Sequence, residues 1–184
     1  MSHFYDLAAR RRSIRRFTEQ ELTQDEVAAL IGTALMAPSS KGTCCWQFVV
    51  IDDRDLLRQL AGCKEHGAAM LAEARAAVAV LADPSVSDVW VEDASVATTY
   101  LLLQAEDCGL GACWVQIRNR RTAGGASAED EVRRLLQIPD HLRVLSLVAL
   151  GHKARERSPF DPESLKWDKV HLNHYASSDA ETGV

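Results

Sequence analysis

The sequence lacks most features that mark secreted, disulfide-stabilised or membrane-spanning proteins. Its 184 residues include five cysteines, an odd number without any Cys-x-x-Cys pair. Such a set is not typical of a disulfide framework or a zinc site, and it favours reduced thiols in a cytosol. No apolar run reaches the ~20 residues of a membrane-spanning helix. The first residues also lack the charged and apolar regions of a signal peptide, so we expect a cytoplasmic protein without a membrane partner.

Motifs of several common functional classes are missing too. There is no Gly-x-Ser-x-Gly and no Gly-x-x-x-x-Gly-Lys-Ser/Thr, so triad hydrolysis and P-loop chemistry have no support. No basic stripe interleaved with aromatic residues suggests RNA or single-stranded DNA. The net charge of −5 also argues against a nucleic-acid partner, because domains that bind nucleic acid are usually basic.

Metal binding has little support either. His171 and His174 are spaced three apart, as two ligands on one helix face would be, but no third ligand is evident. We interpret them as ordinary histidines and expect no metal. The cysteines are each expected to be small buried apolar residues. They are Cys44, Cys45, Cys63, Cys108 and Cys113.

A cluster of arginines on this acidic chain is the strongest local feature. Five of the seven residues from 10 to 16 are arginines, and the other two are Ser13 and Ile14. Guanidinium groups bind phosphate oxygens bidentately, and a serine hydroxyl adds a neutral donor. The segment therefore predicts an anion site. The alternatives are a solvated basic helix end or a nucleic-acid contact, and Arg10 and Arg16 are expected simply to face solvent.

Hydrophobic periodicity predicts helices and short strands in alternation. Thr23 and Glu26 form a capping box that starts the second helix. The segment 76–82 has no polar face and indicates a central buried strand, while the helix at 89–107 is apolar on most sides and therefore buried. Helices are expected at 3–12, 23–37, 56–60, 67–73, 89–107 and 128–137, and strands at 46–51, 76–82, 112–117 and 144–150.

Two more blocks follow the arginine run. The first covers 37–48, with the sequence APSSKGTCCWQF, and the second covers 109–114, with the sequence GLGACW. In this order and at these intervals the three blocks resemble the FMN-dependent nitroreductase family. The resemblance covers about residues 5–150. No single block is specific for the family, but the ordered set is.

The resemblance implies an α+β three-layer fold, with a mixed central sheet flanked by helices. It also implies an intertwined homodimer with two FMN sites at its interface. One domain would cover residues 1–176, and its proline-broken segment from 153 to 175 would extend onto the partner subunit. Residues 177–184 are expected to be a disordered tail.

The resemblance further implies which groups hold FMN. Arg11, Arg12 and Ser13 would bind the phosphate, and Arg15 would reach the ribityl chain and the pyrimidine edge of the ring. A fixed cation there favours hydride acceptance, because two-electron reduction leaves negative charge near N1 and O2. The candidate set is Arg11, Arg12, Ser13, Arg15, Pro38, Ser39, Ser40, Thr43, Trp114, Val115, Gln116, Ile117, Arg155 and Arg157.

Within this set, residues 114–117 would lie along the ring, with the backbone N–H of Gln116 or Ile117 directed at flavin N5. The two tail arginines would be the distal phosphate ligands. The chain departs from the family at 42–46, where Gly-Thr-Cys-Cys-Trp replaces Asn-x-Gln-Pro-Trp. A ring contact there would have to come from Thr43 or Lys41. Three further arginines either reach a phosphate of FMN or of the nicotinamide cofactor, or are solvated: Arg118, Arg120 and Arg121.

We therefore expect an FMN-dependent oxidoreductase that passes electrons from NADH or NADPH to an electron-poor small molecule, such as a nitroaromatic or a quinone, by ping-pong hydride transfer. No side chain is evident as a catalytic acid, so the flavin would carry the chemistry. The alternatives on the same fold are reductive dehalogenation and a specialised biosynthetic redox step. Two others are a non-catalytic flavin-binding protein and an anion-binding regulatory protein without flavin.

Overall fold

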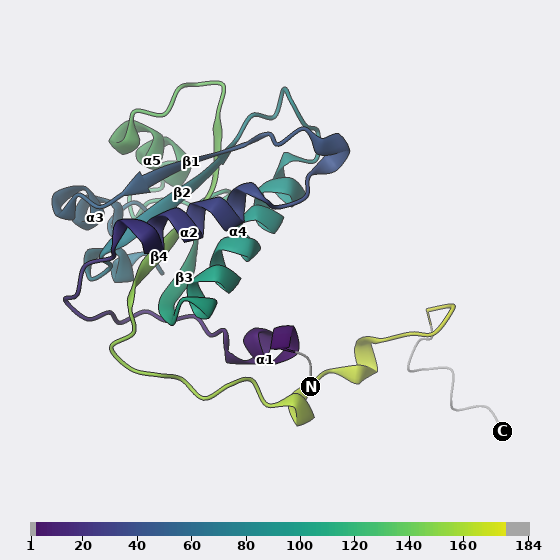
Figure 1. Cartoon of the computed structure of the whole chain (residues 1–184). Coiled ribbons are helices and arrows are strands. Elements are labelled where there is room, and N and C mark those ends of the chain that lie inside the picture. The colour runs from purple at the N-terminus through teal and green to yellow at the C-terminus, as the bar shows by residue number, and fades with distance from the viewer. Residues whose placement is uncertain (1–2, 176–184) are drawn as a thin grey trace.

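A computed structural model describes residues 3–175 and shows one sheet with helices on both faces (Figure 1). The helices and strands are α1 (His3–Arg10), α2 (Gln24–Leu35), β1 (Trp46–Ile51), α3 (Arg54–Leu60), β2 (Ala76–Ala82), α4 (Trp90–Asp107), β3 (Leu110–Gln116), α5 (Ala128–Leu136) and β4 (Arg143–His152). The short 3-10 turns are η1 (Ser40–Gly42), η2 (Ala69–Ala72), η3 (Pro162–Ser164) and η4 (Trp167–Lys169). Within the described residues, no helix is both long and apolar enough to cross a membrane.

The strands lie in the order β1-β2-β4-β3, and each pair is antiparallel. A parallel bridge joins Ser13 to Ala112 outside the named strands. The fold class is as expected, but the sheet formed by a single chain is antiparallel rather than mixed. The segment after α1 lies parallel to β3 but joins it through this single bridge. It is therefore not a strand of the sheet, and the sheet lacks a parallel member.

Side chains of the central strands alternate between two apolar cores, which makes the fold three-layered as expected. On one face α2 and α4 cover Val78 and Val80 of β2. On the other face α3 and α5 cover Ala79 and Leu81. All seven residues of β2 are buried, because a strand with neighbours on both sides and helices on both faces meets no water. The prediction of a central strand at 76–82 is confirmed.

Several element boundaries differ from the sequence-based expectations. Helix α1 ends at Arg10 instead of residue 12, and the helix expected at 67–73 is only the four-residue turn η2. A segment this short cannot gain enough intrahelical hydrogen bonds to offset the cost of starting a helix. Strand β3 begins at Leu110 instead of residue 112, because Gly109 takes a left-handed conformation (φ 73°) that reverses the chain directly after α4.

Two of the five cysteines are exposed, contrary to the expectation of burial. Cys44 lies in the turn after η1 with a φ of 48°, and Cys108 caps the C-terminal end of α4. Both cysteines lie in turns at the surface, so their side chains are exposed to water. The other three cysteines are buried, as expected.

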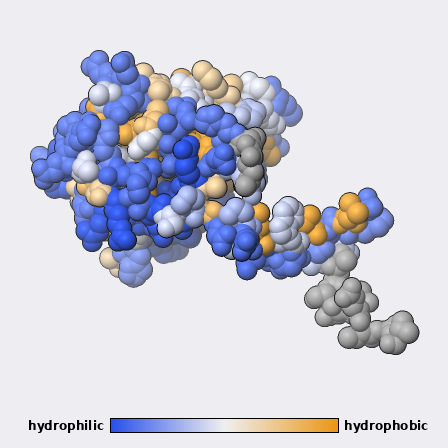
Figure 2. Space-filling view, turned by 60° about the horizontal axis from the view of Figure 1, so that its bottom comes forward, coloured by the Kyte–Doolittle hydropathy of each residue, from blue (hydrophilic) through white to orange (hydrophobic). Residues whose placement is uncertain are grey.

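The tail after β4 first runs past α1, where the N–H of Phe160 donates to the carbonyl of Ala9 at 2.7 Å, and then projects from the body of the molecule (Figure 1). Its apolar side chains are exposed, with Leu172 at 87% and Trp167 at 70%. Figure 2 shows hydrophobic patches along the projecting arm. The tail therefore has no core of its own. The expected disordered segment at 177–184 lies outside the described residues.

The capping box of α2 should make stability depend on pH. The backbone N–H of Thr23 donates to the Glu26 carboxylate at 2.7 Å, and this bond is the main cause that lowers the pKa of Glu26 below its ordinary 4.5. A lowered pKa means that the stabilisation is complete above the unfolded-state pKa and is lost as the pH falls through the folded-state pKa. We expect Glu26→Gln to cost about 1 kcal/mol near neutral pH and much less below pH ~4. Urea denaturation at several pH values measures this, and an equal cost at every pH would contradict it.

Candidate functional site

The arginine run lies in an extended conformation along the free edge of β3. The backbone N–H of Ile14 donates to the carbonyl of Ala112 at 2.9 Å. The side chains of Ile14 and Phe17 are buried, while Arg15 and Arg16 are exposed. The two buried apolar side chains are three residues apart, and the two arginines between them face outward. Arg10 is also exposed, as expected.

Two glycines make this close approach possible. A Cβ atom on Gly111 would lie 2.7 Å from Cγ2 of Ile14, and one on Gly151 would lie 2.9 Å from Cδ1 of Phe17. Real Cβ atoms do not come this close to other heavy atoms, so a side chain at either glycine would push the run off the sheet. The second glycine of the Gly-Leu-Gly block is therefore needed for packing rather than for the turn.

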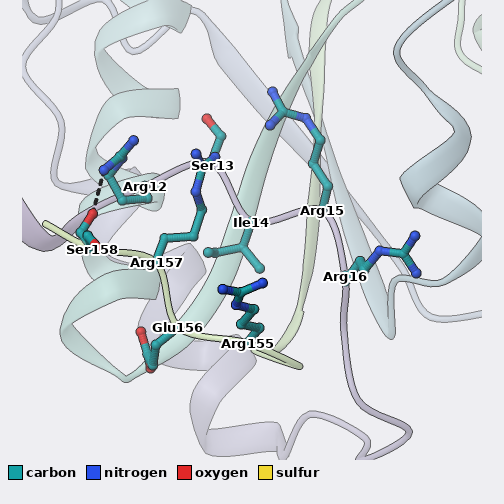
Figure 3. Close-up of a pocket in the computed structure, with 9 residues that line it drawn as sticks. All are labelled: Arg12, Ser13, Ile14, Arg15, Arg16, Arg155, Glu156, Arg157 and Ser158. Carbon is teal, nitrogen blue, oxygen red and sulfur yellow. Dashed lines mark hydrogen bonds between the residues drawn. The ribbon is translucent and has the colours of Figure 1, made fainter. Parts of the chain in front are cut away.

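The arginine run and the tail enclose an open pocket of about 550 Å³ (Figure 3). We call it the arginine pocket. It is lined by Arg12, Ser13, Ile14, Arg15, Arg16, Arg155, Glu156, Arg157 and Ser158. Five of these residues are arginines and one is acidic, so the pocket carries a large positive charge. The structure thus brings both tail arginines of the candidate set opposite Ser13, although more than 140 residues separate the two segments.

Arg11 and Arg12 have different positions from those expected of a pair of phosphate ligands. Arg12 donates a hydrogen bond to the carbonyl of Ser158 and so ties the tail to the rim of the pocket. Arg11 is not among the lining residues. Burial raises the pKa of the Cys113 thiol above its ordinary value. The positive charges of Arg15, Lys64 and Arg11 act in the opposite direction but offset this rise only partly.

A buried ion pair holds the beginning of the tail. The ammonium group of Lys153 lies 3.0 Å from the carboxylate of Glu106 at the end of α4, and their side chains are only 7% and 9% exposed. The same ammonium lies 3.2 Å from Glu156. Sequence analysis did not find this pair, because the partners are 47 residues apart and neither belongs to a motif.

The far end of β3 presents backbone rather than side chains. Val115 and Ile117 are fully buried, so their side chains cannot line a site on this edge. The N–H of Ile117 donates to the carbonyl of Leu145 at 3.2 Å. Because successive N–H groups of a strand point to opposite sides, that of Gln116 points to the free edge. Of these two N–H groups, only that of Gln116 is directed to the free edge.

Lys64 is a candidate residue that sequence analysis missed. It follows α3, and its ammonium group donates to the carbonyl of Gln116 at 2.9 Å. Burial lowers the pKa of this lysine, and the charge of Arg120 acts in the same direction. On the same strand the indole N–H of Trp114 donates to the Gln116 amide oxygen at 2.9 Å. Lys64 and Trp114 together fix the end of β3, and no spacing pattern in the sequence indicates this contact.

The Pro-Ser-Ser turn lies at the other end of α4. The backbone N–H of Ser40 donates to the Asp93 carboxylate at 2.8 Å, near the start of this helix. The arginine run lies beside the helix end that carries Glu106. An 18-residue helix is about 27 Å long, and Figure 1 shows η1 and the segment after α1 at opposite sides of the molecule. One chain therefore does not bring Pro38, Ser39, Ser40 and Thr43 to the arginine pocket.

The three arginines that follow β3 do not line this pocket, and neither do His171 and His174. Arg118 packs over the ring of Trp90 at 5.6 Å, and Arg121 donates to the carbonyl of Gly125. Neither of them, nor Arg120, lines the arginine pocket. In residues 3–175 no group of three histidine, cysteine or acidic side chains is placed to hold a metal ion.

Comparison with known proteins identifies the fold and its relatives. The model of the Nitroreductase family matches residues 8–90 and 64–152, which together cover most of the chain. The chain belongs to the nitroreductase family. The resemblance seen in the sequence is thereby confirmed, and so is the α+β three-layer fold that it implied.

Individual relatives agree with this assignment. An Archaeoglobus fulgidus protein with the provisional name NADH dehydrogenase/NAD(P)H nitroreductase is 32% identical, over 88% of this chain and 92% of that protein. An FMN reductase (NADPH) of Bacillus subtilis is 29% identical, over 95% of this chain and 75% of that protein. The structure of an FMN-dependent nitroreductase from Clostridium difficile R20291 superposes with a TM-score of 0.91 and 35% identity, covering 93% of this chain and 99% of that one.

The buried ion pair gives a prediction for this nitroreductase that needs no cofactor. Glu106→Gln should lower the free energy of unfolding by about 3 kcal/mol, because removal of one partner leaves a buried charge without compensation. Glu156→Gln removes the exposed partner of the same lysine and should cost less than about 1 kcal/mol. Urea denaturation of both variants measures the difference. Equal costs would mean that Lys153 is solvated rather than buried.

Proposed function

We propose that this nitroreductase is an FMN-dependent oxidoreductase that takes electrons from NADH or NADPH and passes them to an electron-poor small molecule, such as a nitroaromatic or a quinone. The observation that carries the proposal is the arginine pocket, a strongly cationic site in a member of this family. The names of the Clostridium difficile and Bacillus subtilis relatives support FMN and NADPH as its cofactor and reductant.

The groups around the pocket fit the phosphate end of FMN. A phosphate monoester carries about −1.5 to −2 charges at pH 7 and three acceptor oxygens. The pocket offers Ser13 as a neutral donor, with Arg155 and Arg157 facing it from the tail. Arg12 would close the rim through its bond to the Ser158 carbonyl. Arg11 would act through its charge, since it does not line the pocket.

The free edge of β3 fits the ring end. FMN, when bound, supplies the hydride-accepting and hydride-donating chemistry. The chain would orient the ring with the N–H of Gln116 and would place the charges of Arg15 and Lys64 beside it. Cations at this edge favour the reduced, more negative form of a flavin. Reductant and acceptor would then use the same open face in turn, which gives ping-pong kinetics.

The complete site requires a second copy of the chain. The turn at Pro38, Ser39, Ser40 and Thr43 would approach the ring from the partner subunit, because its own chain holds it at the far end of α4. Two surfaces support a homodimer. Helix α1 has no buried residue, and the tail carries exposed apolar side chains that would pack on the partner. We also propose that the protein is cytoplasmic and that its single domain covers residues 1–176.

Binding of FMN tests the phosphate site. The purified protein should be yellow or should gain a flavin spectrum when FMN is added, and NADH or NADPH should bleach this spectrum anaerobically. Arg157→Ala should weaken FMN binding about 10- to 100-fold, the range of one lost hydrogen bond to a charged group. Its control is Arg134→Ala, which removes an exposed arginine paired with Glu131 on α5.

Two outcomes would contradict the proposal. A colourless wild-type protein that binds no FMN would exclude a flavin enzyme. Bound FMN that neither NADH nor NADPH reduces would leave a non-catalytic flavin-binding protein instead.

The assembly has its own test. We expect a dimer by light scattering and expect the double variant Trp167→Asp, Leu172→Asp to weaken it at least tenfold. Each change removes roughly 2 kcal/mol of apolar burial and adds a charge. The matched control is Glu163→Lys, because this residue lies in the same tail but is exposed and polar. If the double variant dimerises as tightly as the wild type, the tail does not form the interface.

A further inference from the structure

The carboxylate of Asp93 lies buried beneath the Pro-Ser-Ser turn. The residue is 5% exposed and stands in the first turns of α4. Three neutral donors surround it. The backbone N–H of Ser40 and the hydroxyl of Ser87 each lie 2.8 Å from one of its oxygens, and the thiol of Cys45 lies 3.6 Å away. A buried carboxylate is costly unless hydrogen bonds satisfy it, and these three donors supply such bonds.

The turn above the carboxylate holds an unfavourable backbone shape. Lys41, Gly42 and Cys44 all have positive φ angles, at 54°, 65° and 48°. The left-handed region is unfavourable for residues other than glycine, and such strain persists only where the surroundings enforce it. The hydroxyl of Ser39 accepts a bond from the N–H of Cys44 at 2.9 Å and closes the turn. The hydroxyl of Thr43 is buried without a hydrogen-bond partner in the same turn.

Asp93 connects this strained turn to the rigid core. Ala94, Ala97 and Leu101 of the same helix are fully buried against the sheet, so core packing fixes where the carboxylate stands. A negative charge near the N-terminal end of a helix is also favourable there. Burial raises the pKa of the Cys45 thiol, and the charge of Asp93 raises it further. Cys45 therefore remains protonated and serves as a donor to the carboxylate rather than as a nucleophile.

We infer that Asp93 is a positioning residue, whose carboxylate holds the turn from Ser39 to Thr43 in the shape with which it contacts the flavin bound by a second copy of the chain. The inference rests on the proposed function, since the turn meets FMN only in the homodimer. A buried charge and a strained backbone would be needless in a loop that merely joins α2 to β1. Both become useful where a few backbone and hydroxyl groups must stay in place against a ring.

The test compares two substitutions of Asp93 in the full-length protein. Asp93→Ala removes all three hydrogen bonds and should raise the Kd for FMN at least about tenfold. It should also change the midpoint potential and the visible circular dichroism of the bound flavin. Asp93→Asn should restore affinity to within about threefold of the wild type. The amide oxygen still accepts from the Ser40 N–H, and the Ser87 hydroxyl can turn to accept from the amide.

Two further variants separate positioning from stability. Thr98 lies on the same helix as Asp93, further toward its C-terminal end. Thr98→Ala removes a buried hydroxyl that donates to the Ala94 carbonyl at 2.8 Å. It should lower the melting temperature of the apoprotein without changing the potential or dichroism of bound FMN. Ser87→Ala removes a single donor to Asp93 and should shift FMN affinity in the same direction as Asp93→Ala, by about threefold. It serves as the test if Asp93→Ala does not fold.

The outcomes separate the inference from the proposed function. If the wild type binds FMN and NAD(P)H reduces it, but the Asp93 and Ser87 variants keep its affinity, potential and dichroism, the positioning role is wrong and the oxidoreductase stands. The role is also wrong if Thr98→Ala changes these flavin properties as much as Asp93→Ala does. If the wild type binds no FMN, both the inference and the proposed function fail.

Discussion

The close packing of residues 13–17 against the edge of the sheet is the contact on which the candidate site depends. One backbone hydrogen bond, from Ile14 to Ala112, sets the register. The side chains of Ile14 and Phe17 then occupy the space that Gly111 and Gly151 leave open. Burial of these two apolar groups turns the intervening guanidinium groups outward. A cluster of like charges, which would otherwise spread into solvent, is thereby fixed along one side of a pocket.

The sequence predicted those features that depend on neighbouring residues. The strand expected at 46–51 has the bounds of β1, because an uninterrupted β-rich run between turns has few other conformations. The box of Thr23 and Glu26 caps α2 as expected, since both of its bonds span three residues. The arginine run was predicted to be an anion site from its charge alone, and the order of the three blocks identified the family.

Features that depend on distant contacts could not be predicted in this way. The pairings of Lys153 with Glu106, Lys64 with Gln116 and Ser40 with Asp93 span 47, 52 and 53 residues. Although Ser40 belongs to one of the three blocks, no motif indicates the partner in any of these pairs, and each pair forms only when the chain has folded. The division of the candidate set between the two ends of α4 was also hidden, because sequence order says nothing about which groups lie within reach of each other.

The free edge of β3 has a consequence for the pairing of this strand with other molecules. An unpaired outer strand normally exposes a row of donors and acceptors to which strands of other molecules can add. Here the residues before α2 cover one end of that row, through the Ile14–Ala112 bond, and the ammonium group of Lys64 occupies the carbonyl of Gln116 at the other end. The stretch left between them is too short for a foreign strand to register. This edge would therefore admit a small flat molecule more readily than a foreign strand.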